Sequence, residues 1–496
     1  MASNQEYTSF GRQVIYVIIA QAATSIIAII QIPILTRGLG ATQYGIFSLI
    51  TATVALISAF ALLGLSTSVI RFLSGEKDKA RLRDGFLSAY LAVALSGAVF
   101  SALLFASSAF LADSIIKDPG SVIYIRLASI LIILSALNAL TIVFFRVFRQ
   151  IGRYAIVIIA YKVFEIVLIA VSLYMGYQLP GVIVALILNN LLFDLILLFV
   201  VLKQIGFQLP GFSDLKPYLA YSLPLILNPT ILWIIINSDR YLVTYFLGVT
   251  ANGVYSAAYE IGNFASFILM PLITVLYPTL AKSYDESNLT QTKTYFKYSV
   301  KYLMLIAIPS AFGLSLLAKP LLAIFTTPEF VPGTGVVPFI AFGAVLFGFF
   351  QICIYVVHLV KKTYWSLILM SLAAIVNIVL NLFLIPLAGI LGAAIATFIA
   401  YGMLGVLTLL LSRKYLQFDL SLLFIVKSCA ASAAMSVFLW LVNPQTIIAV
   451  IISIAAAVLI YFALLYAMKS FSKEEITFFN HFIKDHIRKT GITGKG

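Results

Sequence analysis

Charged side chains inside long apolar segments are the residues of this sequence best placed to do chemistry. The basic ones are Arg37, Arg126, Lys162 and Arg240, and the acidic ones are Glu165, Asp194, Asp239 and Glu260. If these segments cross a bilayer, each charge costs about 2.5–3.5 kcal/mol on insertion scales. Each residue therefore needs a functional or a structural partner.

The basic residues suit an anionic substrate. Arginine binds phosphate oxygens through two parallel hydrogen bonds, and lysine acts as a point charge. We expect Arg126, Lys162 and Arg240 to line a cavity for such a substrate, and Arg37 to contribute from a glycine-flanked turn. Two alternatives remain open: Lys162 and Glu165, three residues apart, can neutralise each other on one helix face, and Arg37 can cap backbone carbonyls.

The acidic residues Glu165, Asp194, Asp239 and Glu260 are candidates for ion coupling. A buried carboxyl group can bind Na⁺ or exchange a proton near neutral pH. A structural ion pair is the alternative for each of them. Uncharged polar residues in the apolar segments could bind polar groups of a substrate or join helices; they are Asn138, Asn189, Asn190, Asn228, Asn237, Gln351, Asn377 and Asn381.

Residues for catalysis or for a resident metal are missing from the pattern. His358, His481 and His486 are far apart, and Cys353 and Cys429 lie in separate apolar runs. Neither set has the spacing of metal ligands, and no nucleophile elbow or P-loop consensus occurs. We therefore expect no catalytic residue, no metal and no cofactor beyond a coupling ion, and a protein that is not an enzyme.

The composition indicates the elements that position these charges. Of the 496 residues, 62% are hydrophobic and 10% charged, and the mean hydropathy is +1.08. Soluble domains are about 45–50% apolar and about 25% charged. These values exclude a soluble or a disordered chain and indicate an all-α polytopic membrane protein.

Fourteen apolar segments are long enough to cross a bilayer, which takes roughly 20 residues each. They cover residues 12–36, 44–70, 85–112, 122–146, 154–176, 181–202, 217–246, 252–280, 294–318, 335–358, 363–386, 389–412, 422–442 and 446–468. The N-terminus, the loops after even-numbered spans and the C-terminus hold 26 of the 32 basic residues, and the opposite loops only Lys117 and Lys319. This bias places both termini in the cytoplasm. It also explains the net charge of +14 without a nucleic-acid partner.

An internal duplication divides the chain. Residues 35–49 and 243–257, at the ends of spans 1 and 7, are identical at six of 15 positions with a constant offset of 208. Spans 1 and 7 run in the same direction, which is typical of transporters with parallel repeats. We expect an N-lobe (1–202, six spans), a cytoplasmic linker (203–216), a C-lobe (217–413, six spans) and two added spans (414–468). A cytoplasmic amphipathic tail (469–496) follows, with Ile476, Phe479, Phe482, Ile483 and Ile487 on one face.

The run from Pro33 to Gly45 (PILTRGLGATQYG) and the second-lobe run that begins at Asp239 (DRYLVTYFLG) resemble those of polysaccharide-biosynthesis flippases. These proteins belong to the multidrug/oligosaccharidyl-lipid/polysaccharide (MOP) exporter superfamily. The resemblance implies movement of a polyprenyl-diphosphate-linked oligosaccharide from the cytoplasmic to the outer leaflet by alternating access, without ATP hydrolysis.

The same resemblance implies a protein of the plasma or inner membrane that serves cell-surface polysaccharide biosynthesis. We expect a monomer, because each chain holds both lobes. Its expected partners are membrane lipids, a polysaccharide polymerase and glycosyltransferases. The alternative is a cation-coupled multidrug extruder of the same fold. Negative cavity walls favour the extruder and positive walls favour the flippase, but the charges within the spans are nearly balanced.

Overall fold

The computed structural model describes residues 2–472, 475 and 477, and no β-strand occurs among them. The first half contains α1 (Ala2–Ala61), α2 (Leu65–Leu73), α3 (Lys79–Ala106), α4 (Ser108–Leu111), α5 (Val122–Thr141), α6 (Phe144–Val147), α7 (Ile151–Tyr174), α8 (Gln178–Ile205) and α9 (Leu215–Ser222). The second half contains α10 (Leu227–Leu247), α11 (Val249–Gly262), α12 (Phe264–Asp285), α13 (Leu289–Phe325), α14 (Val336–Leu359), α15 (Tyr364–Ala388), α16 (Ile390–Tyr415), α17 (Leu422–Val442) and α18 (Ile447–Ala467).

Lipid offers no hydrogen-bond partners to the backbone. An α-helix satisfies its backbone hydrogen bonds within one segment, so long apolar helices can cross a membrane. Twelve helical segments among the described residues are long and apolar enough to cross a membrane. One of them, Ile15–Ala61, has 47 residues and covers the first two expected spans, while α11 and α12 divide the expected span 252–280. The predicted class, an all-α polytopic membrane protein, is confirmed.

Two glycines turn the chain at equivalent points of the duplication. Gly40 interrupts α1 with φ 68° and ψ 173°, and Gly248, 208 residues later, separates α10 from α11 with φ 89° and ψ 166°. Glycine reaches positive φ without steric cost, so it is the residue expected at both turns. The repeated sequence motif therefore encodes a repeated helix break.

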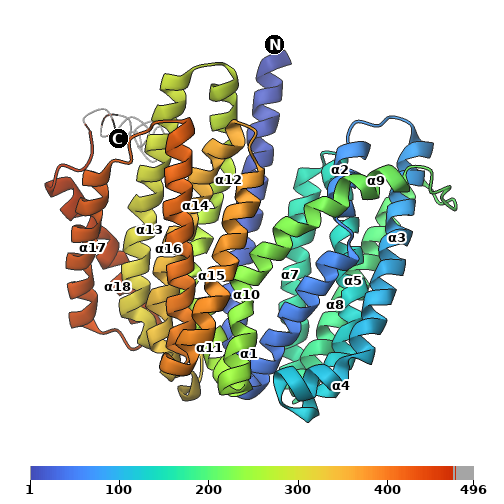
Figure 1. Cartoon of the computed structure of the whole chain (residues 1–496), viewed down its shortest axis with the longest axis horizontal. Helices are drawn as coiled ribbons and strands as arrows, with labels where there is room; N and C mark the ends of the chain where they lie inside the picture. Colours follow the sequence, from blue (N-terminus) through green and yellow to red (C-terminus); the bar gives the residue numbers. More distant parts are fainter. Residues whose placement is uncertain (1, 473–474, 476, 478–496) are drawn as a thin grey trace, which may run out of the picture.

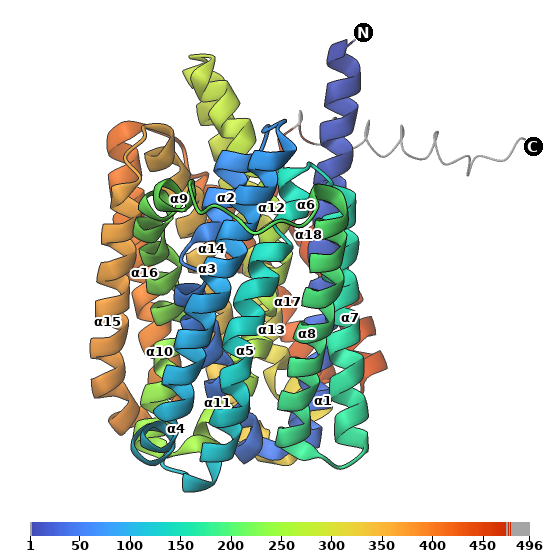
Figure 2. The same ribbon diagram turned by 90° about the vertical axis from the view of Figure 1, so that its right-hand side faces the viewer.

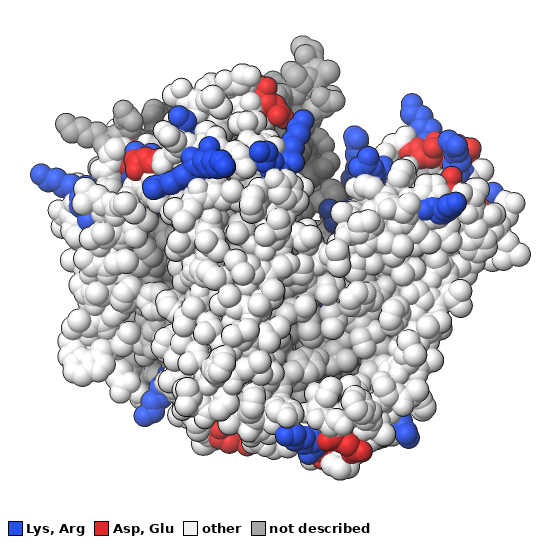
Figure 3. Space-filling model, in the orientation of Figure 1, with Lys and Arg blue, Asp and Glu red and all other residues white. Residues whose placement is uncertain are grey.

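The helices pack as two bundles (Figure 1, Figure 2). In the N-terminal bundle α1 contacts α5 and α7, and α8 packs against both of these helices. In the C-terminal bundle α14 packs against α13 and α16, and α15 packs against α10 and α16. The helices α17 and α18 lie outside the C-terminal bundle against α13. The space-filling view is hollowed between the bundles at its upper edge, the end at which the N-terminus lies (Figure 3).

The bundles join at the lower end of Figure 1, between α1 and α11, through residues that the duplication makes equivalent. The hydroxyl groups of Thr42 and Thr250 lie 2.9 Å apart, and those of Ser48 and Ser256 lie 2.8 Å apart. Both pairs are separated by 208 residues, which is the offset of the sequence repeat. A pseudo-two-fold axis therefore passes between these pairs.

Replacing Gly253 by alanine should strongly weaken this junction. A Cβ atom at Gly253 would lie 1.9 Å from the carbonyl oxygen of Ala41, and one at Gly45 would lie 2.1 Å from that of Val249. Backbone cannot yield as a side chain does, and overpacking costs about 1–3 kcal/mol or more. We expect thermal unfolding in detergent at a clearly lower Tm. Gly313→Ala is the matched control, because nothing lies within 4 Å of a Cβ there. Equal Tm values for the two variants would contradict this packing.

The start of the C-terminal segment is bound to the C-terminal bundle by a buried ion pair. The Lys301 ammonium on α13 lies 2.7 Å from both carboxylate oxygens of Glu475. Glu475 also accepts from the Ser472 N–H at 2.7 Å and donates its own N–H to the Ser472 hydroxyl at 3.2 Å. These reciprocal bonds have the pattern of a capping box. The remainder of the tail expected over 469–496 lies largely outside the described residues.

Replacing Glu475 by glutamine should lower the free energy of unfolding by about 1–3 kcal/mol, because the Lys301 ammonium then stays buried without a counter-charge. Burial tends to raise the pKa of Glu475, but the bonds from Lys301 and Ser472 outweigh it, and the pKa lies below its ordinary 4.5. A depressed pKa contributes stability above about pH 4.5 that is lost as the pH falls through the folded value. Tm measured against pH should therefore separate wild type from Glu475→Gln at pH 7 and bring them together in acid. A constant difference would contradict this.

Candidate functional site

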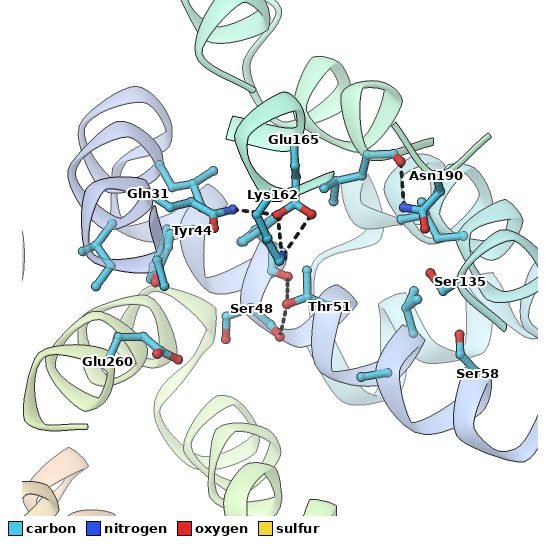
Figure 4. Close-up of a pocket in the computed structure, with 18 of the residues that line it drawn as sticks. Gln31, Tyr44, Ser48, Thr51, Ser58, Ser135, Lys162, Glu165, Asn190 and Glu260 are labelled. Atoms are coloured by element: carbon cyan, nitrogen blue, oxygen red, sulfur yellow. Dashed lines mark hydrogen bonds and ion pairs between the residues drawn. The ribbon is translucent and has the colours of Figure 1, made fainter. Parts of the chain in front are cut away.

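A cavity of about 470 Å³ lies on the inner side of the N-terminal bundle, where it faces the C-terminal bundle (Figure 4). Its walls come from α1, α5, α7 and α8, and from α10 and α11 of the other bundle. The polar residues that line it are Gln31, Tyr44, Ser48, Thr51, Ser58, Ser135, Tyr161, Lys162, Glu165, Asn190, Arg240 and Glu260. Four of the eight charged candidates thus face one cavity.

Lys162 supplies the positive charge of the N-terminal wall. Its ammonium lies 2.9 and 3.1 Å from the carboxylate oxygens of Glu165, one helical turn along α7. Glu165 is buried and also accepts a 3.3 Å hydrogen bond from Gln31 on α1. The Lys162 side chain keeps 39% of its surface exposed, so its charge stays accessible to a ligand in the cavity.

Arg240 supplies the positive charge of the opposite wall. Its guanidinium lies 2.9 Å from Glu260 and 5.5 Å from the centre of the Tyr259 ring. The side chain is 10% exposed, and its Nε has no hydrogen-bond partner in the described part of the chain. Glu260 is 33% exposed and points toward the cavity from α11 (Figure 4). The net charge of Lys162, Glu165, Arg240 and Glu260 together is zero.

Asp239 lies in a separate, fully buried polar cluster behind this wall. Its carboxylate accepts hydrogen bonds from Tyr255 and, at 3.4 Å, from Thr397. Asn377 donates to Thr397 at 3.2 Å and accepts from Asn381 at 3.1 Å. The side-chain oxygen of Asn381, Oδ1, is buried with no hydrogen-bond partner among the described residues. One carboxylate and several neutral oxygens form a donor set that suits a hard monovalent cation.

The remaining candidates lie away from the cavity. Arg126 is exposed near the start of α5, where it donates to Ser108 at 3.1 Å and lies over the ring of Phe105. Arg37 donates to the carbonyl of Ile324 near the junction of the bundles. Both therefore have structural partners at the lower end of the molecule.

Asp194 joins three helices of the N-terminal bundle. It is buried on α8 and accepts hydrogen bonds from Tyr90 on α3 at 2.8 Å and from Thr141 on α5 at 3.3 Å. These contacts give it a structural partner on each side and no exposure to the cavity.

Residues near the junction of α11 and α12 also line two further cavities. An apolar one of about 640 Å³ lies between α13, α17 and α18, and includes Ile29 of α1 and Phe264 of α12. A neutral, aromatic one of about 760 Å³ lies within the C-terminal bundle, and includes Tyr259 and Asn263. Because Glu260 lines the charged cavity, the six residues 259–264 contribute to all three.

Sequence reasoning missed Gln31 and Tyr44 on the cavity wall and Tyr255 and Thr397 beside Asp239. The duplication contains a signal for Gln31, because the offset of 208 pairs it with Asp239. Tyr44 lies in the run Pro33–Gly45 that carries the family resemblance, but nothing in that run indicates that its side chain faces a cavity.

Two family profiles match the chain. The one described as "Polysaccharide biosynthesis protein" covers residues 10–284, more than half of the chain, and the one described as "MatE" covers residues 224–383. Among curated proteins, the probable flippase AglR of Haloferax volcanii is 25% identical over 179 residues, 33% of this chain and 34% of that protein. The chain thus matches about a third of the length of the curated relatives found.

Solved structures share the fold. The lipid II flippase MurJ in an inward closed conformation superposes with a TM-score of 0.77 at 17% identity, over 91% of this chain and 98% of that chain. An inward-facing multidrug resistance MATE transporter of the MOP superfamily superposes with a TM-score of 0.70 at 16% identity, over 79% and 94%. The sequence-based assignment to the MOP superfamily is confirmed.

Proposed function

Because the chain belongs to the family of polysaccharide biosynthesis proteins, we propose that it flips a polyprenyl-diphosphate-linked oligosaccharide by alternating access. One observation carries this proposal: residues 259–264 contribute to the walls of the charged, the apolar and the aromatic cavity. A lipid-linked glycan joins a diphosphate, an apolar chain and neutral sugars in one molecule. The three cavities offer each part a matching environment.

The charged cavity suits the diphosphate. Lys162 and Arg240 approach it from opposite bundles, and each is already paired with a carboxylate, Glu165 or Glu260. A diphosphate that enters can replace these carboxylates as the partner of the two cations. Because Glu260 is 33% exposed, it can withdraw to the aqueous cavity at little cost, whereas Glu165 is held by Gln31.

The apolar cavity suits the polyprenyl chain. Its lining from α13, α17 and α18 includes Leu317, Val450 and Ile454, and its polar contributions are few. On α1, Ile29 faces this cavity and Ala28 and Gln31 face the charged one. The chain could therefore remain in an apolar environment while the diphosphate occupies the charged cavity.

We place the end that carries the N-terminus in the cytoplasm. Lys and Arg side chains gather at this upper end in Figure 3, and the notch between the bundles opens there. The positive-inside bias supports this orientation. The substrate would then enter from the cytoplasmic leaflet of the plasma or inner membrane. Separation of the bundles at the Thr42–Thr250 and Ser48–Ser256 pairs would release it on the other side.

We further propose that a monovalent cation drives the cycle through Asp239. Its buried cluster suits Na⁺ and lies directly behind Arg240, whose backbone N–H donates to the Asp239 carboxylate at 2.9 Å. Cation binding and diphosphate binding would thus act on adjacent residues of α10. The protein would work as a monomer beside a polysaccharide polymerase and glycosyltransferases, and would catalyse no covalent step.

The "MatE" match over residues 224–383 favours a second candidate, a cation-coupled multidrug extruder. Purified protein in liposomes tests both functions. A fluorescent polyprenyl-diphosphate glycan reports flipping through its accessibility to a membrane-impermeant quencher, and a parallel assay follows efflux of an organic cation. We expect movement of the glycolipid above protein-free liposomes. Organic-cation efflux without glycolipid movement would assign the protein to the second function.

A further inference from the structure

The cavity of the C-terminal bundle has a lining unlike that of the charged cavity. Its walls come from α10, α11, α12, α14, α15 and α16, with Gln21 of α1. Its volume of about 760 Å³ lies within the range of ligand pockets, about 300–1,000 Å³. Lys, Arg, Asp and Glu are absent from the described residues that line it. His358 also lines it, so an organic cation would find no carboxylate here and a diphosphate no Lys or Arg.

Aromatic rings form much of this lining. They belong to Tyr259, Phe267, Phe347, Phe350, Tyr355 and Tyr401. Aromatic rings offer flat apolar faces, and tyrosine adds a hydroxyl at the edge. The C–H faces of a pyranose ring pack on such surfaces while its hydroxyls reach polar groups at the rim.

Side-chain amides are available for those hydroxyls. Asn228 on α10 and Gln351 on α14 line the cavity together with Asn263 and with Gln21 of α1, and neither the Asn228 nor the Gln351 amide has a hydrogen-bond partner in the described part of the chain. Each amide offers two donor hydrogens and one acceptor oxygen. Both groups therefore keep their full capacity for a polar, uncharged ligand.

The position of the cavity agrees with this chemistry. Tyr259 lines it, and the Arg240 guanidinium lies 5.5 Å from the centre of the same ring on the side of the charged cavity. A diphosphate bound by Arg240 would place its attached sugar beside Tyr259. The order of the two sites, Arg240 and then Tyr259, would thus match the order of diphosphate and sugar in the ligand.

We propose that the C-terminal cavity is the sugar subsite, in which Asn228 and Gln351 bind hydroxyls of the diphosphate-proximal sugars and so select the glycan. This inference rests on the proposed function, and it identifies the part of the protein that reads the substrate's sugars. The N-terminal cavity binds only the diphosphate, so it does not distinguish one glycan from another.

Binding to the full-length protein in detergent tests the subsite with two probes. One is farnesyl diphosphate, and the other is farnesyl diphosphate that carries a neutral disaccharide. We expect Asn228→Leu/Gln351→Leu to weaken binding of the glycosylated probe roughly tenfold, the effect of losing two or more hydrogen bonds, and to leave farnesyl diphosphate unchanged. Gln445→Leu, in the loop between α17 and α18, is the matched control and should change neither Kd.

A second measurement removes any dependence on the folding of the double variant. In a Cys429→Ser background, Gln351→Cys should be alkylated, and the glycosylated probe should slow this reaction more than farnesyl diphosphate does. Equal protection by the two probes, or equal loss of binding for both, would overturn the sugar subsite. Lys162→Gln separates this failure from failure of the proposed function. This variant should bind both probes more weakly, and unchanged binding of both would refute the diphosphate site itself.

Discussion

Replacing Asp239 by asparagine is expected to abolish the dependence of transport on a sodium gradient while the folded protein persists. The asparagine can still accept the Tyr255 hydrogen bond, so the cluster keeps its shape. It loses the only charge among the donor oxygens formed with Thr397, Asn377 and Asn381. A cation at this fully buried site would then lack a counter-charge. We expect its binding to weaken at least tenfold, which corresponds to about 1.4 kcal/mol.

The measurement is glycolipid flipping in liposomes with and without an imposed Na⁺ gradient, with Tm as a check on folding. Asp194→Asn is the matched control: this carboxylate is equally buried but bonds Tyr90 and Thr141 between helices of the N-terminal bundle. We expect it to lower Tm and to keep the gradient response. A sodium response retained in Asp239→Asn would refute the assignment. A response only to a pH gradient would assign the same carboxylate to a proton.

The fold could be predicted from the sequence to the level of its helices. Apolar length marks a membrane span because lipid offers no hydrogen bonds to an open backbone. The breaks at Gly40 and Gly248 were also visible, since both lie in the repeated motif. The duplication indicated that the two motifs are equivalent, but their contact across the molecule follows only from the packing of the bundles.

The candidate site could be predicted only in part. Span helices are apolar on nearly all faces, so their periodicity does not reveal which side faces a cavity. Lys162 and Arg126 looked equivalent by this criterion, yet Lys162 lines the charged cavity and Arg126 lies exposed beside Phe105. Asp239 and Arg240 are adjacent in sequence, but one enters the buried cluster and the other faces the cavity wall.

The duplication places residues of different charge at equivalent positions of the two bundles. The position equivalent to Asp239 is Gln31, a neutral residue that holds Glu165 beside Lys162. The N-terminal bundle therefore offers an accessible cation where the C-terminal bundle offers a buried carboxylate. A transporter that couples an anionic substrate to a cation needs this asymmetry.

Removing the two cavity cations together is expected to eliminate glycolipid flipping. Each charge-assisted hydrogen bond to a phosphate oxygen contributes about 1.5–3 kcal/mol, so Lys162→Gln or Arg240→Gln alone should weaken diphosphate binding roughly 10- to 150-fold. The double variant loses the positive charge of both walls and leaves Glu165 and Glu260 to repel the substrate. Binding of farnesyl diphosphate and flipping of the fluorescent glycolipid measure the two effects.

Arg126→Gln is the matched control for charge, because Arg126 is equally cationic but lies outside the described cavity. It should bind and flip as wild type does, and a loss there would instead make Arg126 a substrate-binding residue. Glu260→Gln removes a negative charge from the same cavity, so it should affect diphosphate binding in the opposite direction. It frees Arg240 from its carboxylate partner, so we expect tighter diphosphate binding but slower flipping, because Glu260 can no longer displace the substrate when the cavity opens to the other side.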